Sequence, residues 1–471
     1  MTKSSQREEE RETGIRYVNL YEADDKVYTR RITGFYQRLR RYTGIPLIAG
    51  YLLMPWLVID GRPAMLFDLP ERRFHVLWLS FGPQDGMFLA WLLIIAAFLL
   101  FTVTVLVGRV WCGFTCPQTV WTQMYIWAEN LCEGDRNKRI KLDRQPWGPQ
   151  KLVRKGAKHG IWLSIALITA VTFVGYFVPI RELLVGLATV EVHPAAAFWV
   201  LFFTAATYVN AGFMREQVCK YMCPYARFQS VMYDQDTLTV FYNYIRGEPR
   251  GPRKLTDDRA ELGLGDCIDC SWCVQVCPVD IDIRDGLQAE CIDCGLCVDA
   301  CNAVMDKMHY PRGLISFTTE DAIEKGHTRV FRPRFLAYGA VLLVMFSVFT
   351  YALSERLPVG LDVLRDRGMR MYRISGKDVQ NVYTLKIHNK DRETHTYDVS
   401  VSGEYDFELG GYRPLPVEEG EIVTAPVRVI VPRDELDKVK TSVTLRVEAR
   451  DNPAIHTEHT TTFIGPTPRE R

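Results

Sequence analysis

The chain reads CIDCSWCVQVCP at residues 267–278 and CIDCGLCVDAC at residues 291–301. Both stretches follow one rhythm, with two residues between the first and second cysteines, two between the second and third, and three between the third and fourth. Together they contain eight of the thirteen cysteines in a chain of 471 residues. Such tight spacing bends the backbone around a compact group of thiols. Its repetition predicts two equivalent sites.

The spacing is the one with which bacterial ferredoxins hold two [4Fe–4S] clusters: three thiolates of each run bind one cluster and the fourth crosses to the other. The ligands predicted for the first cluster are Cys267, Cys270, Cys273 and Cys301. Those predicted for the second are Cys291, Cys294, Cys297 and Cys277. Zinc sites usually use two Cys-x-x-Cys pairs separated by a longer loop, and disulfides require an oxidising compartment. The runs therefore predict iron, iron–sulfur clusters and electron transfer.

Apolar stretches predict a membrane protein. Four of them are long enough for a helix to cross a bilayer, which takes about 20 residues; they are residues 87–107, 160–178, 195–213 and 335–353. We predict that a fifth stretch, residues 44–59, also crosses, although it contains Pro46 and Pro55. Charged residues make up 24% of the chain and the net charge is +1, so no nucleic-acid partner is expected.

The distribution of cations predicts the orientation of these spans. Residues 108–159 carry ten Lys and Arg against four Asp and Glu, and residues 30–41 carry five arginines. Residues 60–86 carry only three arginines and residues 179–194 carry one. By the positive-inside rule, the cation-rich loops face the cytoplasm. We therefore expect a multi-pass protein of the bacterial inner membrane, with its N-terminus and cysteine runs in the cytoplasm and its C-terminal part in the periplasm.

These features divide the chain into five predicted parts. They are a cytoplasmic N-terminal segment (1–43), four transmembrane helices (44–213), a cytoplasmic region (214–334) with a ferredoxin-like α+β domain at about 257–312, a fifth transmembrane helix (335–353) and a periplasmic domain (354–471). In the last part, apolar and polar residues alternate over residues 379–390, 396–402, 421–432 and 441–450. Short alternating segments separated by turn residues predict an antiparallel, immunoglobulin-like β-sandwich.

A second group of cysteines follows two of the predicted spans. The sequences CGFTCP at residues 112–117 and CKYMCP at residues 219–224 share the pattern Cys-x-x-x-Cys-Pro, here called the CysPro motifs. Four-residue spacing predicts two thiols on one helix face, and the proline predicts a helix break or restart. If the two span ends pack together, four thiols converge to form a redox or copper site: Cys112, Cys116, Cys219 and Cys223.

The residues leave the chemistry of these four thiols open. A soft thiolate group can hold Cu(I), zinc or iron, it can work as two dithiols, or its members can be buried small side chains. Cys132 has no partner at a useful spacing, so we interpret it as structural.

The order of features resembles the cytochrome c oxidase accessory protein family, called CcoG, RdxA or FixG. Paired CysPro motifs, a dicluster ferredoxin segment, a last span and an outer β-sandwich carry the resemblance, from about residue 30 to residue 464. The resemblance implies assembly of cbb3-type cytochrome oxidase through reduction of Cu(II) to Cu(I). The partners it implies are membrane lipid, a cytoplasmic electron donor, copper ions and oxidase assembly factors or subunits. A homodimer is left open.

Two other functions fit the same residues. One is a relay of electrons from quinol to a partner oxidoreductase, as in the NapH-like proteins, which share the CysPro motifs. The other is a non-catalytic scaffold for oxidase assembly, in which the clusters only sense redox state. The prediction is therefore an iron–sulfur electron-transfer protein, with a cupric reductase as its expected activity.

Overall fold

The computed structural model describes residues 26–466, apart from positions 60, 71, 78, 83, 84, 258, 260, 356, 366–371 and 392. The chain forms two compact units, each built from three stretches of sequence. Unit 1 comprises Met1–Ile48, Val103–Leu167 and Phe203–Val330, and unit 2 comprises Ala49–Thr102, Ile168–Phe202 and Phe331–Arg471. Both cysteine runs and both CysPro motifs therefore belong to unit 1.

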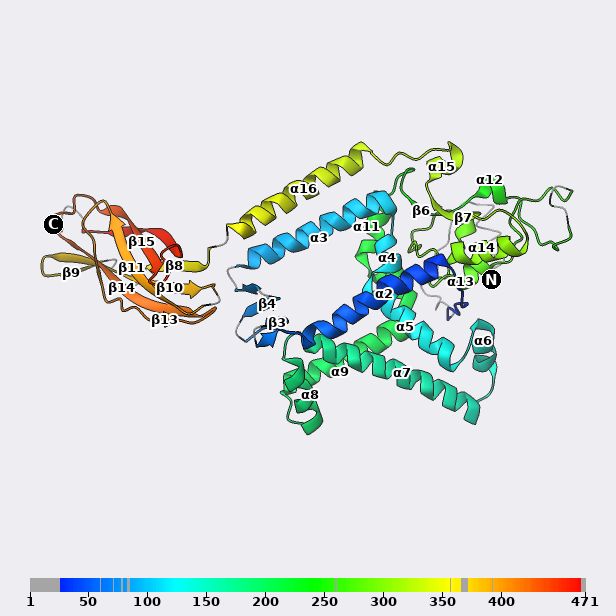
Figure 1. The fold of residues 1–471 in the computed structure, drawn as a ribbon, viewed down its shortest axis with the longest axis horizontal. Coiled ribbons are helices and arrows are strands. Elements are labelled where there is room, and N and C mark those ends of the chain that lie inside the picture. The colour runs from blue at the N-terminus through cyan, green and yellow to red at the C-terminus, as the bar shows by residue number, and fades with distance from the viewer. Residues whose placement is uncertain are drawn as a thin grey trace. The chain divides into compact units, whose positions relative to one another are not determined.

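Among the described residues, four helical stretches are long and apolar enough to cross a membrane (Figure 1). They are α3 (Gly86–Val107), α7 (Pro149–Val174), the continuous stretch Pro194–Met222 that begins with α9 (Pro194–Val209), and α16 (Pro333–Ser354). Each one contains or overlaps a predicted span. The fifth prediction, residues 44–59, is not among them.

Helix α2 (Phe35–Leu53) starts before that fifth stretch and ends inside it. A 3-10 turn, η1 (Met54–Trp56), follows, and then the short strand β1 (Val58–Ile59), which pairs with β2 (Arg62–Pro63). Pro55 has no N–H to donate to the helix ladder, so the α-helix ends here. The membrane span at residues 44–59 therefore stays a prediction.

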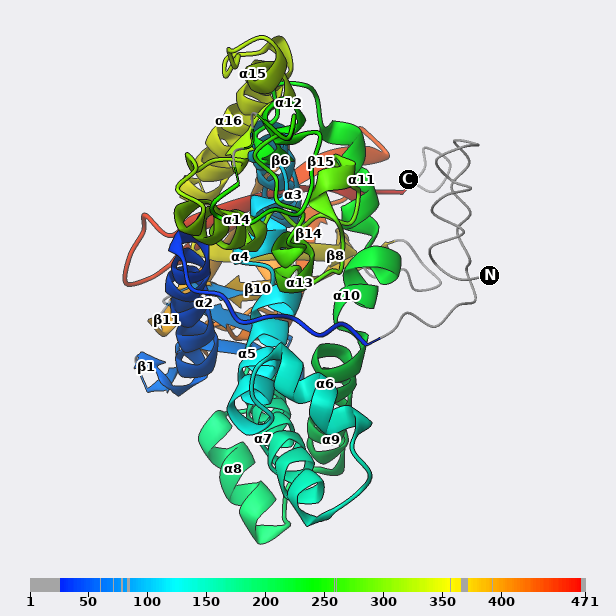
Figure 2. The same cartoon turned by 90° about the vertical axis from the view of Figure 1, so that its right-hand side faces the viewer.

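Unit 1 is mostly helical. Its shorter helices are α4 (Val110–Phe114), α5 (Pro117–Cys132), α6 (Arg136–Arg144), α10 (Arg215–Gln217), α11 (Pro224–Met232), α12 (Tyr244–Gly247), α13 (Trp272–Val276), α14 (Leu296–Lys307), α15 (Glu320–Glu324), the π-helices η3 (Asn210–Met214) and η4 (Val218–Met222), and the 3-10 turn η5 (Ile283–Asp285). Helix α5 lies beside α7 (Figure 2). The Tyr125 hydroxyl donates to the Trp162 carbonyl over 3.0 Å, and the Trp162 indole donates to the Tyr125 carbonyl over 3.1 Å.

The cysteine runs lie in a small α+β substructure. Strand β6 (Thr239–Tyr242) pairs antiparallel with β7 (Ile315–Thr318), in register from Thr239 with Thr318 to Tyr242 with Ile315. Helices α13 and α14 pack against each other (Figure 1); α13 contains Cys273 of the first run, and α14 contains Cys297 and Cys301 of the second. Buried Val240, Leu314 and Ile315 join them in one core.

A carboxylate of this substructure caps helix α2. Asp299 on α14 accepts hydrogen bonds from the backbone N–H groups of Tyr36, at 3.2 Å, and Gln37, at 2.8 Å. These N–H groups are in the first turn of α2, where no backbone carbonyl can accept them. Negative charge at a helix N-terminus is also favoured by the helix dipole. The cap thus fixes the start of α2 on the ferredoxin-like substructure.

Unit 2 contains the β-sandwich at residues 359–464 (Figure 1). One sheet has the order β12-β14-β10-β8, with β9 on β10, and the other has β13-β11-β15-β16. The strands are β8 (Val359–Arg365), β9 (Arg373–Ser375), β10 (Asp378–Asn389), β11 (His395–Gly403), β12 (Glu408–Gly410), β13 (Pro416–Val417), β14 (Ile422–Pro432), β15 (Lys440–Ala449) and β16 (His456–Ile464). Unit 2 also has α8 (Ile180–Thr189) and a small sheet of β3 (Met65–Asp68), β4 (Arg73–Val76) and β5 (Leu79–Phe81).

The alternation in the sequence sets the core of the sandwich. Leu385, Val429 and Leu445, which are apolar residues of the alternating segments, are fully buried, and they come from three different strands. Asn381 is the polar exception on β10: its amide donates to the Ile464 carbonyl at 2.8 Å and accepts from the Ile464 N–H at 3.3 Å. This side chain therefore ties β10 of one sheet to β16 of the other.

Replacing Asn381 with alanine leaves a buried N–H and a buried carbonyl of Ile464 without partners. We expect Asn381→Ala to lower the free energy of opening of β16 by about 2 kcal/mol. Hydrogen exchange of the β16 amides in the full chain measures this. Ser442→Ala, on the exposed side of β15, is the control. Equal protection in the two variants would contradict the assignment of Asn381 as the tie between the sheets.

Candidate functional site

Four thiols from both cysteine runs line one small cavity. Cys267, Cys270 and Cys273 come from the first run, and Cys301 reaches the same cavity from α14. Tyr242, Trp272, Arg284 and Met305 are among the other residues of its wall. The fourth cysteine of the second run thus lies with the first three of the other run, as the predicted crossing requires. A cavity walled by four thiols fits a [4Fe–4S] cluster.

The other four cysteines are also packed together. Cys294 belongs to a buried apolar group that also contains Val279 and Ile292. Three further cysteines pack against this group: Cys277, Cys291 and Cys297. Burial raises the pKa of the Cys277 thiol to about 12, and the nearby Cys294 thiol adds to this. Cysteine binds a metal as the thiolate, which this apolar environment disfavours. The iron of a bound cluster would supply the positive charge that stabilises the thiolates. These residues fit a second cluster.

The two cysteine runs repeat in local backbone structure. Asp269 and Ser271 have φ of 51° and 54°, and the corresponding Asp293 and Gly295 have φ of 49° and 70°. These left-handed positions curl each loop and bring the backbone N–H of Trp272 toward the Cys270 sulfur, where it opposes the rise in the thiol pKa that burial causes. The backbone N–H of Leu296 acts on the Cys294 thiol in the same way. Amide hydrogen bonds to sulfur tune the potentials of such clusters.

The CysPro motifs share one local structure, which differs from the prediction. Cys112 lies in α4, whereas Cys116 is extended, at φ −58° and ψ 129°, just before α5. In the second motif Cys219 lies in π-helix η4, whereas Cys223 is extended just before α11. The prediction of two thiols on one helix face was wrong. A proline disfavours helical backbone in the residue before it, so the helix breaks at the second cysteine and restarts at the proline.

The four CysPro thiols nevertheless converge. The Cys112 thiol lies within electrostatic range of Cys116, Cys219 and Cys223. Burial raises the pKa of Cys112 to about 12, the other thiols add to this, and Arg109 opposes it. The Cys112 thiol donates to the Gln229 amide oxygen at 3.4 Å. Cys132, at the other end of α5, does not join the group.

In the part of the chain that the structure describes, no three His, Cys, Asp or Glu side chains are arranged to hold one metal ion.

The first CysPro motif packs directly on the loop of the second cluster. A Cβ added to Gly113 would be 2.7 Å from the carbonyl oxygen of Ile292 and 2.9 Å from the Cα of Cys294. Cys112 itself contacts the apolar group around Cys294. Only a glycine allows this approach of the two backbones, so the motif and the cluster loop form one continuous site.

Arg109 and Asp293 hold this contact, and both were missed from the sequence. The backbone N–H of Arg109 donates to Asp293 at 2.8 Å, and its guanidinium donates to the carbonyls of Ala289 and Cys291. Asp293 also accepts from the N–H of Val240 at 3.2 Å and from the Tyr233 hydroxyl at 3.2 Å. The signal available in the sequence was an arginine shortly before each CysPro motif, Arg109 and Arg215.

The second arginine anchors a buried ion network. Glu129 on α5 accepts from Arg139 at 2.6 Å and from Arg215 at 2.8 Å, and neither Glu129 nor Arg139 is exposed. Burial by itself would raise the pKa of Glu129, but the two guanidiniums together hold it below its usual value. The network connects the helix after the first CysPro motif to the segment before the second. It therefore sets the distance between the motifs.

Comparisons with known proteins match the same regions. The families described as "4Fe-4S binding domain", "4Fe-4S dicluster domain" and "IG-like fold at C-terminal of FixG" match residues 89–141, 214–320 and 349–466. Each of the two iron–sulfur matches contains one CysPro motif.

Three curated proteins are similar over most of their length. Nitrogen fixation protein FixG of Rhizobium meliloti is 38% identical over 82% of this chain and 80% of its own. Protein RdxB of Cereibacter sphaeroides is 40% identical over 87% of both chains, and protein RdxA of the same organism is 39% identical over 82% and 84%. A crystal structure of a FixG-related protein from Vibrio parahaemolyticus is 30% identical over 23% of this chain and 98% of its own, with a TM-score of 0.22.

We expect Gly113→Ala to disturb the second cluster site and spare the first, because the added methyl group forces the loop at Ile292 to move. The electron paramagnetic resonance spectrum of the reduced protein and its iron content measure this. Gly160→Ala is the matched control, since a Cβ there meets open space. A Gly113→Ala spectrum identical to that of the control would contradict the contact.

Replacing Glu129 with glutamine leaves two buried guanidiniums without a counter-charge. We expect Glu129→Gln to cost about 3 kcal/mol of stability at pH 7. The folded-state pKa of Glu129 is lowered, so this stability is present above its ordinary pKa of 4.5 and is lost as the pH falls below it. Urea unfolding of the full chain against pH measures the difference. Glu182→Gln, at an exposed position, is the control. A loss of stability in Glu129→Gln no larger than that in Glu182→Gln would contradict the role of the network.

Proposed function

The chain belongs to the FixG and RdxA family of iron–sulfur proteins, and from that premise we propose that it reduces Cu(II) to Cu(I) at the CysPro thiols for the assembly of cbb3-type cytochrome oxidase. The observation that carries the proposal is the packing of Gly113 on the loop of the second cluster. It joins the residues that fit an iron–sulfur cluster to thiols, which are the soft ligands that Cu(I) prefers. An electron could therefore pass from the second cluster site to the CysPro thiols through bonded and packed atoms, without another protein between them.

The residues of the two cysteine runs have the role of cluster ligands. When bound, the clusters would supply single electrons, which matches the one-electron difference between Cu(II) and Cu(I). Arg284 lies near the Cys273 thiol and Arg40 lies near Cys277 and Cys294. Each cluster site thus has one guanidinium that offsets the negative charge of its thiolates.

The CysPro thiols have the role of copper ligands. Cu(II) is the substrate, one electron converts it to Cu(I), and soft thiolates favour the reduced ion. Because burial raises the pKa of Cys112, copper must displace a proton from the thiol, and the positive charge of Arg109 makes that displacement easier. Gln229, whose amide oxygen accepts from the Cys112 thiol, is placed to orient that proton, which then leaves to solvent.

The membrane arrangement is part of the same proposal. The N-terminus, the CysPro motifs and the ferredoxin-like substructure face the cytoplasm, where a soluble donor can supply electrons, and the β-sandwich faces the periplasm. The cation-rich residues 108–159 support this orientation. In the periplasm the sandwich would contact oxidase assembly factors or subunits, because its long strands leave a broad surface for docking.

The proposal predicts that chemically reduced, cluster-loaded protein converts Cu(II) to Cu(I) while the clusters are re-oxidised. A Cu(I) chelator and the visible absorbance of the clusters measure the two halves of the reaction under anaerobic conditions. We expect Cys112→Ala and Cys219→Ala, with both clusters intact, to lose at least tenfold in rate, and Cys132→Ala to keep the wild-type rate.

The other outcomes separate the parts of the proposal. Copper reduction that persists in the Cys112 and Cys219 variants would move the site away from the CysPro motifs. Clusters that stay reduced after Cu(II) is added would overturn the cupric reductase activity itself.

A further inference from the structure

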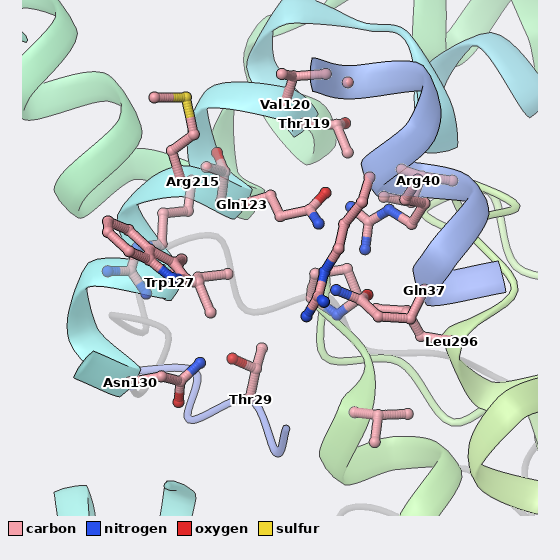
Figure 3. A pocket seen from close by; sticks show the side chains of 18 of the residues that line it. Thr29, Gln37, Arg40, Thr119, Val120, Gln123, Trp127, Asn130, Arg215 and Leu296 are labelled. Carbon is pink, nitrogen blue, oxygen red and sulfur yellow. The ribbon is translucent and has the colours of Figure 1, made fainter. Parts of the chain in front are cut away.

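Unit 1 contains a cavity of about 750 Å³ between α2, α5 and the second cluster site. Figure 3 shows the side chains of Gln37, Arg40 and Gln123 pointing into it from two helices, with Thr29 and Asn130 at its other end. Its volume lies within the range of small-molecule sites, roughly 300–1,000 Å³. Of the CysPro cysteines, Cys219 lines the cavity and the other three do not. The cluster ligands do not line it either.

Several polar groups around the cavity have no partner among the described residues. Thr29 Oγ1, Thr122 Oγ1 and Asn130 Oδ1 are buried and unpaired, and both threonines are more than nine-tenths buried. Arg40 uses only its Nε, which donates to the Gly113 carbonyl at 3.0 Å. Leaving a buried polar group unpaired costs about 1–3 kcal/mol. The same groups, spread over α2, α5 and the preceding loop, would be satisfied by one ligand.

The charge distribution narrows the ligand class. Among the charged groups that line the cavity, Arg215 is neutralised by Glu129, Arg30 lies over the Trp272 ring at 3.8 Å, and Glu216 is a buried carboxylate. Arg40 is therefore the one buried guanidinium left facing the cavity among the described residues. The exposed Arg31 and Arg41 lie at its edge. One guanidinium with amides and hydroxyls suits carbonyl or hydroxyl oxygens better than a phosphate group.

The apolar walls suit a flat ring. Its apolar lining includes Ile45 and Ile48 of α2, Val279 and Ile292 of the cluster loops, and Leu296 at the start of α14. Trp127 adds an aromatic face. Ile292 and Leu296 flank Cys294, and Arg40 lies within electrostatic range of Cys294 and Cys277. A ring held here is therefore next to both the second cluster site and Cys219.

We infer that this cavity binds the head group of a quinol, with Gln123, Arg40 and Thr122 as hydrogen-bond partners of its oxygens, and that quinol is an electron donor of the protein. The inference rests on the proposed function in one respect, that electrons leave through the clusters. A quinol gives up two electrons and two protons to become the quinone. The electrons reduce the two clusters by one each, and the protons leave through the open edge at Arg31 and Arg41.

The test uses the full cluster-loaded chain in detergent and a short-chain benzoquinone as the probe. We expect saturable binding by isothermal titration calorimetry, weakened about five- to tenfold in Gln123→Leu and in Thr122→Val. Both replacements keep the side-chain volume and remove one hydrogen-bonding group. Gln150→Leu, on the exposed start of α7, is the matched control. A photoreactive azidoquinone should label peptides of α2 and α5, and the reduced probe should bleach the clusters of the wild-type protein.

Three results would overturn the inference: no saturable binding, equal binding in the Gln123 and Gln150 variants, or labelling outside α2 and α5. The purified protein could instead retain an anionic phospholipid that the quinone does not displace. If the double replacement Arg31→Ala and Arg41→Ala abolishes that retention, the cavity is assigned to lipid. Copper reduction by chemically reduced wild-type protein needs no quinol. The two proposals can therefore fail separately.

Discussion

The contact of the Gly113 backbone with the loop Ile292–Cys294 is the constraint on which the rest of unit 1 depends. It brings together residues about 180 positions apart in the chain, with no side chain between the two backbones. Such an approach leaves little tolerance, because packed interiors respond to a change of one methyl group. The first CysPro motif can therefore keep its place only if the cluster loop keeps its own. A cluster loop that is misfolded, or that lacks its cluster, would therefore change the position of Cys112.

Buried carboxylates maintain this arrangement by bonding to several elements at once. Asp293 joins the cluster loop to Arg109 and to β6, Asp299 joins α14 to the start of α2, and Glu129 joins α5 to α6 and to Arg215. A buried charge is costly unless it is paired and hydrogen-bonded. Here each carboxylate has two or more donors, from segments distant in sequence. These pairs select one packing of the segments more than they add stability.

Features that repeat within a short window could be predicted from the sequence. The two cysteine runs, four of the five apolar spans and the alternation in β10, β14 and β15 each depend on nearby residues, and the structure contains them. Strand β16 was missed because HTEHTTTFI is threonine-rich, with few apolar residues to alternate. The placement of Cys116 and Cys223 was wrong because the effect of Pro117 and Pro224 on the preceding backbone outweighs helical spacing. The Asp299 cap and the cavity arise from contacts between distant segments, which no local pattern encodes.

The two cluster sites differ in their surroundings. Cys267, Cys270, Cys273 and Cys301 lie with Tyr242 and with Arg284, whose partner Asp269 is exposed. Cys277 and Cys294 instead lie under the first CysPro motif and beside the cavity. Among the described residues, the first site therefore lies near exposed Asp269, whereas the second is the one that Cys112 contacts. Because Arg40 faces both the cavity and the second site, a ligand bound there would change the charge around the cluster site that Cys112 contacts.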